Sequence, residues 1–526
     1  MILGFDFDNT IICYDNLFYR CALDHGWISE KESPKKNDIR NAVRKLQDGE
    51  NKWRQLQLEV YGKRISKAVV KPFFKDFLSW CNHNKIIAHI VSHKMEFAAA
   101  DAAHAYPLRE LSLSWMKDNG VVGTPDSLKE SAVFFTSTRK EKSRKIAELK
   151  CDIFIDDLLE VFEDEEFPDN VEKILFTDDL EETAGIKRCS NWKAIQNLIA
   201  NSEHFLRHIC GQRYGNNMTL ERIVGGRNNR GYKLKNIGTN PLFVKHYMTN
   251  AADNRDRGGV EFSAYRLLHK HGIKSVPKPV YLEDKHVVGI YEWIEGIRPA
   301  SVNPDKFQQF ITFIGQLSGI KIPYDAFPEA SDACFSPLSL IKSIKARRGR
   351  LSEISNTALN DFLKRCDKFL DMTIEDLPSA DSSVEIPIAE RCLSPSDFGL
   401  HNSLINEEGV LHFIDFEYFG WDDPAKMISD FLLHPGMELP IACKQTLYAA
   451  AGEIFSKDCQ KRIRETINLH GLKWCLIMLN EFLRNESDRR IFASNSEDFN
   501  SVCEKQLAKS EMMLHSLIVG DIKKCF

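Results

Sequence analysis

Short apolar runs alternate with amphipathic stretches along the chain up to about residue 198. Each run is a few residues long and rich in branched or aromatic side chains, which is typical of buried parallel strands. The stretches between them, such as residues 142–149, have a helical pattern. This alternation predicts an α/β fold in which helices cover both faces of a parallel sheet. The predicted strands are residues 2–6, 86–91, 132–136, 152–155 and 173–176.

The first two apolar runs are separated by a long segment with a mostly helical pattern, above all over residues 37–60. In open parallel sheets, ligands bind outside the carboxyl ends of the strands. A structured insertion directly after the first strand reaches that place. We therefore predict a helical cap over residues 12–84.

The alternation stops around residues 190–210, so we expect one domain over residues 1–198 and a second over 205–526. The second begins with a glycine-rich segment of strand-like patches and one helix. From about residue 303 the pattern is mainly helical, apart from one strand–turn–strand unit. A small β-rich lobe (205–296) and a larger helical lobe (297–526) form the α+β architecture that this pattern predicts.

Composition narrows the class of partner. The chain has 526 residues, of which 43% are hydrophobic and 28% charged, an ordinary globular balance. A net charge of −5 gives no basic field for nucleic acid or an anionic membrane. The 14 cysteines form no CxxC pair, and neither a signal peptide nor a membrane-length apolar run is visible. These features predict a cytoplasmic protein with unpaired thiols.

Acidic residues follow two of the predicted strands. Asp6 and Asp8 end the first strand, and because residues two apart point the same way, both carboxylates emerge together. Two carboxylates so close together repel each other, so either the pKa of one of them rises or the pair binds a cation. Asp156 and Asp157 end the strand at residues 152–155. Each acid taken singly is equally typical of a helix cap or a solvated loop.

Two further residues complete the set: Ser92 follows the second strand, and Lys142 precedes the helix that leads to the acidic pair. In this order, the four elements resemble the haloacid dehalogenase superfamily of phosphohydrolases over residues 1–198. The motif that carries the resemblance is Asp-Phe-Asp-Asn-Thr at residues 6–10. The resemblance implies a Rossmann-like domain that hydrolyses a phosphomonoester with Mg²⁺.

The resemblance also implies a role for each residue. Asp6 is expected to attack phosphorus and form an aspartyl-phosphate, and Asp8 to protonate the leaving oxygen and then activate water. Lys140 and Lys145 compete with Lys142 for its position. The remaining roles are phosphate binding by Ser92 and Lys142, and Mg²⁺ binding by Asp6 and Asp156 with support from Asp157.

In the second half, Asp397 and Asn402 are five residues apart. This is the spacing of the kinase catalytic loop, whose Asp accepts the substrate hydroxyl proton and whose Asn binds a metal ion. Asp415 lies in the apolar run 411–417, where a kinase places the aspartate that binds Mg²⁺ on the nucleotide. Residues 404–411 read as a hairpin that returns the loop to Asp415.

Upstream residues supply candidates for nucleotide binding. Lys245 lies on a predicted strand and Glu261 begins the next helix, so the two could form the lysine–glutamate pair of kinases. Taken alone, a strand lysine such as Lys245 is more often a solvated edge residue. The other candidates are a phosphate-covering glycine pair and a hinge that faces the nucleotide base: Gly225 and Gly226, and Glu292 and Trp293.

Residues 205–526 resemble the aminoglycoside phosphotransferase/choline kinase family. The most specific stretch is Ile-Asp-Phe-Glu-Tyr-Phe-Gly-Trp-Asp-Asp-Pro at residues 414–424. The family commonly has His-Gly before the catalytic Asp, whereas Pro395 and Ser396 stand here. The resemblance implies a bilobal protein-kinase-like fold, ATP as phosphate donor, Mg²⁺ and a small-molecule hydroxyl acceptor.

Aromatic residues crowd this same stretch. Phe416, Tyr418, Phe419 and Trp421 could cage a cationic substrate. Core packing is the favoured explanation for them.

The fusion predicts a bifunctional enzyme. A kinase and a phosphatase acting on one phosphate would only consume ATP, so consecutive steps on a sugar or amino alcohol fit better, with a phosphorylated metabolite as the phosphatase substrate. Sugar activation is one setting for such steps. Two alternatives remain: a single catalytic domain with the other as scaffold or sensor, and a nucleotide-binding interaction protein without turnover.

Overall fold

The computed structural model describes residues 1–181, 183–224, 229–248, 255–301, 303–378, 382–437, 439–483 and 499–526. The chain divides into two compact units, Met1–Ile209 and Cys210–Phe526. The division falls inside helix α9 (Glu203–Tyr214), a few residues after the boundary we predict. The first half of this helix packs on the first unit, where Phe205 stacks on Trp80 at 5.3 Å between ring centroids. Among the described residues, no helix is both long and apolar enough to cross a membrane.

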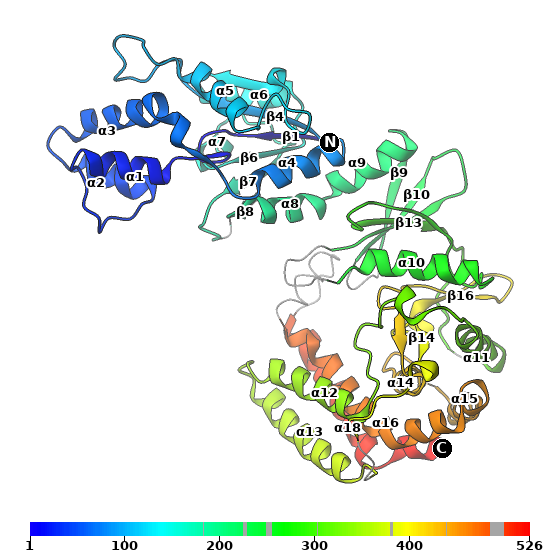
Figure 1. The fold of residues 1–526 in the computed structure, drawn as a ribbon. Coiled ribbons are helices and arrows are strands. Elements are labelled where there is room, and N and C mark those ends of the chain that lie inside the picture. The colour runs from blue at the N-terminus through cyan, green and yellow to red at the C-terminus, as the bar shows by residue number, and fades with distance from the viewer. Residues whose placement is uncertain are drawn as a thin grey trace. The chain divides into compact units, whose positions relative to one another are not determined.

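The first unit is built on a six-stranded parallel sheet in the order β5-β4-β1-β6-β7-β8 (Figure 1). Five of these strands lie where the apolar runs predict them. The sixth, β8, escapes prediction because its sequence Ile-Lys-Arg-Cys has little apolar character. The strands are β1 (Ile2–Phe5), β4 (Ile87–His93), β5 (Val133–Thr136), β6 (Ile153–Asp156), β7 (Glu172–Phe176) and β8 (Ile186–Cys189).

Strand β1 lies at the centre of the sheet, and helices pack on both sides of it. On one face, Phe5 contacts Phe74 of α4 (Phe74–His83) and Trp192 of α8 (Trp192–Ala200). On the other face, Gly4 lies so close to Phe154 that an added Cβ would come within 2.5 Å of its ring. Helix α6 (Arg139–Glu148) packs against β4 and β5. Burial of β1 thus fixes the place where its chain emerges at Asp6.

A helical insertion follows β1. Short strands β2 (Ile12–Cys13) and β3 (Val69–Val70) pair at its base, and its helices contact one another. Our predicted range of 12–84 also includes α4, but this helix packs on the sheet and on α8. The inserted segments are α1 (Asp15–Asp24), α2 (Lys36–Arg44), α3 (Gly49–Leu58), the π-helical turn η1 (Glu59–Lys63) and the 3₁₀ turn η2 (Ile65–Lys67).

The second unit begins with a five-stranded antiparallel sheet in the order β12-β13-β11-β10-β9. Its long helix, α10 (Arg257–Lys270), connects β11 to β12 and begins four residues before Glu261, where the sequence analysis places its start. The strands are β9 (Thr219–Ile223), β10 (Arg230–Lys235), β11 (Leu242–His246), β12 (Pro279–Leu282) and β13 (Val288–Glu292).

The rest of the second unit is mainly helical, as the sequence pattern predicts. Two short antiparallel pairs interrupt the helices: β14 (Cys392–Ser394) with β17 (Gly420–Asp422), and β15 (Ser403–Ile405) with β16 (Leu411–Phe413). The helices are α11 (Pro304–Ser318), α12 (Pro337–Leu351), α13 (Thr357–Glu375), α14 (Pro424–Leu433), α15 (Ile441–Ile454), α16 (Lys457–Met478) and α18 (Phe499–Ile518).

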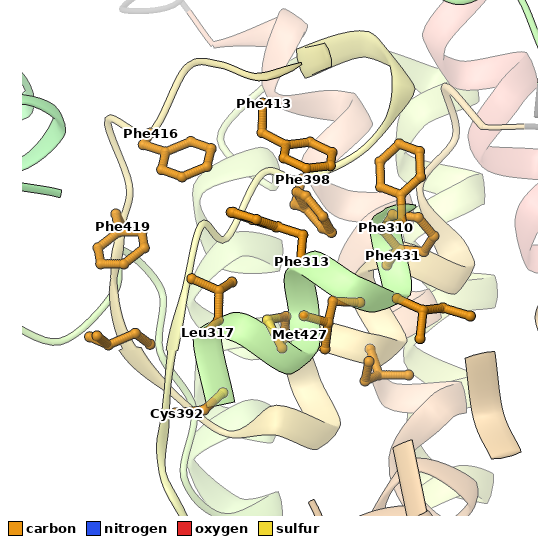
Figure 2. Close-up of a cluster of buried hydrophobic side chains, with 14 of the residues drawn as sticks. Phe310, Phe313, Leu317, Cys392, Phe398, Phe413, Phe416, Phe419, Met427 and Phe431 are labelled. Atoms are coloured by element: carbon orange, nitrogen blue, oxygen red, sulfur yellow. The ribbon is translucent and has the colours of Figure 1, made fainter. Parts of the chain in front are cut away.

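An aromatic cluster forms the centre of this helical lobe (Figure 2). Phe313 of α11 lies 4.3 Å from Phe413 and 5.4 Å from Phe398 between ring centroids. Phe398 directly follows Asp397, and Phe413 ends the strand just before Asp415. The cluster therefore anchors the chain at both acidic residues of interest.

The same core settles the interpretation of the aromatic stretch. Phe416, Phe419 and Trp421 are buried in it, which confirms core packing over a substrate cage for these three. Tyr418 is the exception, since it lines a cavity.

Candidate functional sites

The carboxyl ends of β1 and β6 bring the first set of acids together. The ammonium group of Lys142 lies 2.6 Å from an oxygen of Asp6 and 2.6 Å from an oxygen of Asp156. Its two competitors lie elsewhere: Lys140 pairs with Glu166, and Lys145 with Glu148. Lys142, which starts the buried side of α6, is thus the lysine that the fold places between the two carboxylates.

Asp6, Asp156 and Asp157 form a cluster whose ligand atoms all lie within 4.8 Å of one another. Burial raises the pKa of Asp6 to about 7, with help from the charges of Asp156 and Asp8 and against that of Lys142. Burial also raises the pKa of Asp157 well above its usual value, with help from the charges of Asp156 and Asp6. Lys142 therefore leaves this cluster with surplus negative charge. Oxygen ligands and surplus negative charge are what Mg²⁺ requires.

Asp8 has a partner that the sequence analysis missed. The ammonium group of Lys94 lies 2.7 and 3.0 Å from its two carboxylate oxygens, and the hydroxyl of Tyr14 donates to it at 2.8 Å. Burial opposes the ionised form of Asp8. The charge of Lys94 and these hydrogen bonds together outweigh the effect of burial, so the pKa of Asp8 is lowered. The sequence signal for this partner was the pair of large residues after Ser92, His93 and Lys94, where small residues are expected.

Ser92 lies inside β4 rather than after it, because the strand continues to His93. Its side chain is buried, and its hydroxyl has no hydrogen-bond partner among the described residues. Buried hydroxyls are nearly always paired. The unpaired hydroxyl of Ser92 therefore fits a position that binds a polar ligand.

Replacing Lys94 with methionine is expected to destabilise the first unit. The change leaves Asp8 without its cation, which we expect to lower the free energy of unfolding by about 2 kcal/mol, less than for a fully buried pair because Asp8 keeps some contact with solvent. Urea unfolding of the full chain, followed by tryptophan fluorescence, measures the loss. Adding Asp8→Asn should recover most of it.

The matched control is Lys145→Met, which breaks the ion pair with Glu148 on the surface of α6. Such pairs contribute little, about 0–1 kcal/mol. Equal unfolding midpoints for the Lys94 and Lys145 variants would contradict the importance of the buried pair.

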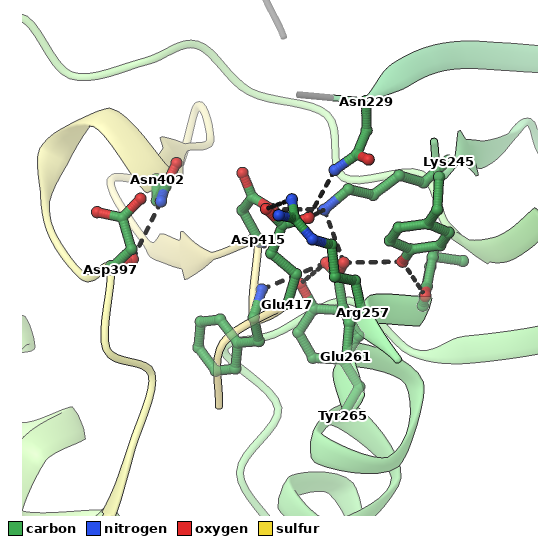
Figure 3. A network of polar contacts seen from close by, with 12 residues as sticks. Asn229, Lys245, Arg257, Glu261, Tyr265, Asp397, Asn402, Asp415 and Glu417 are labelled. Carbon is green, nitrogen blue, oxygen red and sulfur yellow. Dashed lines mark hydrogen bonds and ion pairs between the residues drawn. The ribbon is translucent and has the colours of Figure 1, made fainter. Parts of the chain in front are cut away.

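In the second unit, Lys245 of β11 lies at the centre of a buried polar network (Figure 3). Its ammonium group is 2.7 Å from Glu261 of α10, forms an ion pair with Asp415, and lies 3.8 Å from Glu417. Three carboxylates thus surround one lysine. Burial raises the pKa of Asp415 to about 6. The charges of Glu417 and Glu261 raise it as well, and Lys245 offsets these effects only in part.

Glu261 holds this network in place. It accepts hydrogen bonds from the hydroxyls of Tyr247 and Tyr265 at 2.8 and 2.9 Å. The hydroxyl of Tyr265 in turn accepts the backbone N–H of Asp415 at 2.9 Å. Asp415 adopts a φ of 70°, which is uncommon for a residue with a side chain, and these bonds support that conformation. The predicted strand through residue 417 accordingly ends earlier, at Phe413.

Besides the two tyrosines, three members of the network were given no role in the sequence analysis. Arg257 donates to Glu417 at 3.1 Å, and the amide of Asn229 donates to it at 2.6 Å. Glu417 was visible as the second acid of the motif at residues 414–424, but nothing in the sequence pointed to Arg257 or Asn229. Their contacts cross long sequence distances that no local pattern records.

The loop at Asp397 brings together the predicted pair and adds two histidines. The amide of Asn402 donates to the backbone oxygen of Asp397 at 3.0 Å. Nε2 of His401 lies 2.8 Å from the Asp397 carboxylate, and Nε2 of His434 lies 3.4 Å from the same oxygen. The two imidazole rings stack at 3.9 Å.

The histidines determine the ionisation of Asp397. Burial opposes the ionised carboxylate, but hydrogen bonds from His401 and His434 outweigh it and hold the pKa far below the usual range. Asp397 is therefore a carboxylate at neutral pH, able to accept a proton. His401 follows the aspartate by four residues, and His434 ends α14, so neither stands where the family has its histidine.

The predicted hinge lies at the end of β13. The backbone N–H of Glu292 donates to the oxygen of Lys278 at 2.8 Å, and its carboxylate accepts the N–H of Lys278 at 3.2 Å. The indole N–H of Trp293 donates to Glu295 at 2.6 Å, and the ammonium of Lys233 lies 4.0 Å from the centre of the Trp293 ring. Gly225 and Gly226 lie outside the described residues.

A single cavity of about 1010 Å³ runs between the sheet and the helical lobe of the second unit. Ligand pockets of drug-sized molecules usually span about 300–1,000 Å³, so this one has room for a nucleotide and a small second ligand. It is lined by all the described residues that the sequence assigns to this half: Lys245, Glu261, Glu292, Trp293, Asp397, Asn402 and Asp415.

Residues 219–455 match the phosphotransferase enzyme family. A comparison of the sequence with curated proteins gives no match. Among solved structures, the chain is similar to an ethanolamine kinase from Plasmodium vivax, with 15% identity, a TM-score of 0.41, and coverage of 60% of this chain and 91% of that one. It is also similar to a choline kinase from Cryptosporidium parvum (12% identity, TM-score 0.41, 61% and 98% coverage). A spectinomycin phosphotransferase solved with ADP and spectinomycin gives 15% identity, a TM-score of 0.41, and coverage of 59% and 98%.

Proposed function

We propose that the second unit transfers a phosphoryl group from ATP to the hydroxyl of a small molecule. The proposal starts from the phosphotransferase-family domain with a protein-kinase-like fold at residues 219–455. One observation carries the proposal. A single cavity joins an ionised carboxylate, Asp397, to the buried Lys245–Glu261 pair and to Asp415. This is the combination of proton acceptor and phosphate-binding cation that kinases use.

In this reaction the acceptor oxygen forms a bond to the γ-phosphorus, and the bond from that phosphorus to ADP breaks. Asp397 takes the proton that the hydroxyl releases. Lys245 binds phosphate oxygens of the nucleotide, which then replace Asp415 beside its ammonium group. Freed in this way, Asp415 would hold Mg²⁺ together with the amide oxygen of Asn402. Mg²⁺, when bound, neutralises the charge that builds on the phosphates.

We further propose that the first unit is a Mg²⁺-dependent phosphomonoesterase of the haloacid dehalogenase type. The support is the cluster of Asp6, Asp156 and Asp157, with Lys142 between two of its carboxylates and the unpaired hydroxyl of Ser92 in β4. Asp6 attacks phosphorus, and Asp8 gives a proton to the leaving oxygen. Because Lys94 holds Asp8 ionised, we infer that the substrate phosphate draws Lys94 away, and that Asp8 then takes up a proton from water before it acts as an acid.

The test is product formation by the full chain. ADP release is measured with Mg-ATP against sugars, sugar phosphates, amino alcohols and aminoglycosides, and phosphate release is measured with p-nitrophenyl phosphate and with any kinase product. Acceptor-dependent ADP release supports the kinase. ATP binding without ADP release for every acceptor would favour a nucleotide-binding protein without turnover. Phosphate release that persists without Mg²⁺ would contradict the phosphatase.

His434 is expected to position the base. His434→Phe keeps a ring stacked on His401 but removes the contact to Asp397. We expect kcat for phosphoryl transfer to fall about 10- to 100-fold through misorientation of the carboxylate. Steady-state kinetics with the acceptor found above measures kcat, and nucleotide titration measures affinity for ATP, which should stay unchanged. A variant that lost ATP affinity and kept kcat would contradict the assignment.

A further inference from the structure

The part of the cavity beyond Asp397 is bordered by helices α12, α14, α16 and α18 and by the turn at Asp332. Its lining is rich in basic side chains. The described lining residues on this side include four acids: Asp332, Asp397, Asp430 and Glu481. Asp430 is bound to a lysine. The basic residues are Arg255, Arg347, Arg350, Lys426, Lys473 and Lys509.

Lys473 of α16 is the most unusual of these cations. Its side chain is 2% exposed, yet its ammonium group has only the backbone oxygen of Asp332 at 3.2 Å and the sulfur of Cys334 at 3.9 Å. It forms no ion pair with any residue in the part of the chain that the structure describes. A buried cation that no carboxylate contacts directly is costly. Lys426, nearby in the lining, shows the usual solution, because Asp422 and Asp430 bind it at 2.6 and 3.0 Å.

Arg347 of α12 faces the same turn. Its guanidinium binds the carboxylate of Asp332, while its Nε atom is buried and has no hydrogen-bond partner among the described residues. Asp332 is held at a φ of 66° with its side chain 47% exposed. Burial opposes its ionisation, but Lys473, Arg347, Lys426 and Arg255 together lower its pKa. Arg347 and Lys473 thus surround one anion of the chain itself and keep donor capacity for another.

The features that would bind a cationic acceptor are already in use. The ring of Tyr418 has the guanidinium groups of Arg255 and Arg257 at 5.8 and 5.4 Å from its centre. Asp430 binds Lys426 and accepts the indole N–H of Trp474 at 2.9 Å. An ammonium group would therefore find neither a free aromatic face nor a free carboxylate at these positions.

We propose that the acceptor is an anionic small molecule: a hydroxyl compound that carries a phosphate ester, bound by Arg347 and Lys473 with its free hydroxyl at Asp397. The inference rests on the proposed phosphotransferase function. Arginine and lysine are the side chains that bind phosphate most strongly. Arg350 and Lys509 are exposed and form no ion pair with the described residues, so they extend the positive charge along the cavity lining. The product is a bisphosphate, which is a substrate of the class that a phosphomonoesterase consumes.

The first experiment compares matched acceptors. The full chain with Mg-ATP is given glucose, glucose 6-phosphate, gluconate, glycerol, glycerol 3-phosphate, ethanolamine and choline, and ADP release is measured. We expect turnover with phosphate esters and none with the neutral or cationic compounds. Turnover confined to choline, ethanolamine or a neutral sugar would overturn the inference while keeping the kinase. A preference for gluconate would overturn the phosphate assignment.

The second experiment does not depend on finding the acceptor. Inorganic phosphate is titrated into protein saturated with Mg²⁺ and the non-hydrolysable analogue AMP-PNP, whose own γ-phosphate fills the nucleotide site. We expect wild type to bind phosphate at a site in addition to that of the first unit, and Lys473→Met to bind phosphate at this additional site at least about tenfold more weakly, because a charge-assisted contact is lost. The control is Lys461→Met, an exposed lysine on the same helix, which should bind like wild type.

Two outcomes separate the inference from the function on which it rests. Normal AMP-PNP binding with no phosphate binding to wild type, or with equal binding to the Lys473 variant, would overturn the anion site alone. Absence of AMP-PNP binding to wild type would overturn the kinase itself. If Lys473→Met fails to fold, the exposed pair Arg350→Gln and Lys509→Gln replaces it, and unchanged phosphate affinity in that variant would count against the proposal.

Discussion

Replacing Asp397 with alanine is expected to reduce phosphoryl transfer by about 10²- to 10⁴-fold, the usual contribution of a general base. The carboxylate is held ionised by His401 and His434, so at neutral pH it is in the form that accepts a proton. ATP affinity should stay at the wild-type value, because Lys245, Glu261 and Asp415 form a separate network.

Two measurements check this expectation: ADP release with the acceptor, and direct nucleotide titration. Asp397→Asn serves as the matched variant, since it keeps the size of the side chain and removes only its basicity. Both variants should lose turnover alike. Wild-type turnover in Asp397→Asn would show that the residue orients the acceptor and does not take its proton.

The Asp6→Asn variant is expected to lose phosphomonoesterase turnover by at least about 10³-fold, because an amide cannot form the covalent intermediate. Phosphoryl transfer by the second unit should be unchanged. The variant should also be no less stable than wild type at pH 8. Burial raises the pKa of Asp6 to about 7, so the folded protein favours the neutral side chain and bears a cost for the ionised one above that pH.

Phosphate release and ADP release are measured on the same preparation, and thermal unfolding is followed at pH 8. The control is Asp152→Asn, which changes an acid at the opposite, amino end of β6. Residual hydrolysis at the wild-type rate in Asp6→Asn would mean that another residue is the nucleophile.

The sequence predicted where many of the candidate residues lie in the fold, and the reason is geometric. Residues at the ends of strands are placed by the strand itself, so Asp6, Asp156 and Lys245 lie where the apolar runs put them. Fixed spacing on one loop did the same for Asp397 and Asn402.

Residues whose contacts depend on packing between distant elements were not predicted. Lys94 reaches Asp8 across 86 positions of sequence, and Arg257 reaches Glu417 across 160. His434 reaches Asp397 only because α14 ends beside the catalytic loop. The place of α4 was not predicted for the same reason. Its helical pattern is clear in the sequence, but only tertiary contacts decide whether it packs on the sheet or on the insertion.

The aromatic cluster of the helical lobe has a consequence for how this enzyme would evolve and adapt. Asp397 and Asp415 are each joined by a peptide or two to a phenylalanine of that cluster, Phe398 and Phe413. Close-packed interiors resist small displacements. The separation between Asp397, the proposed proton acceptor, and Asp415, the proposed Mg²⁺ ligand, is thus set by hydrocarbon packing. The helices that line the proposed acceptor site are not tied to it in this way. Substitutions in the helices that line the acceptor side of the cavity can therefore change substrate preference without moving Asp397 relative to Asp415.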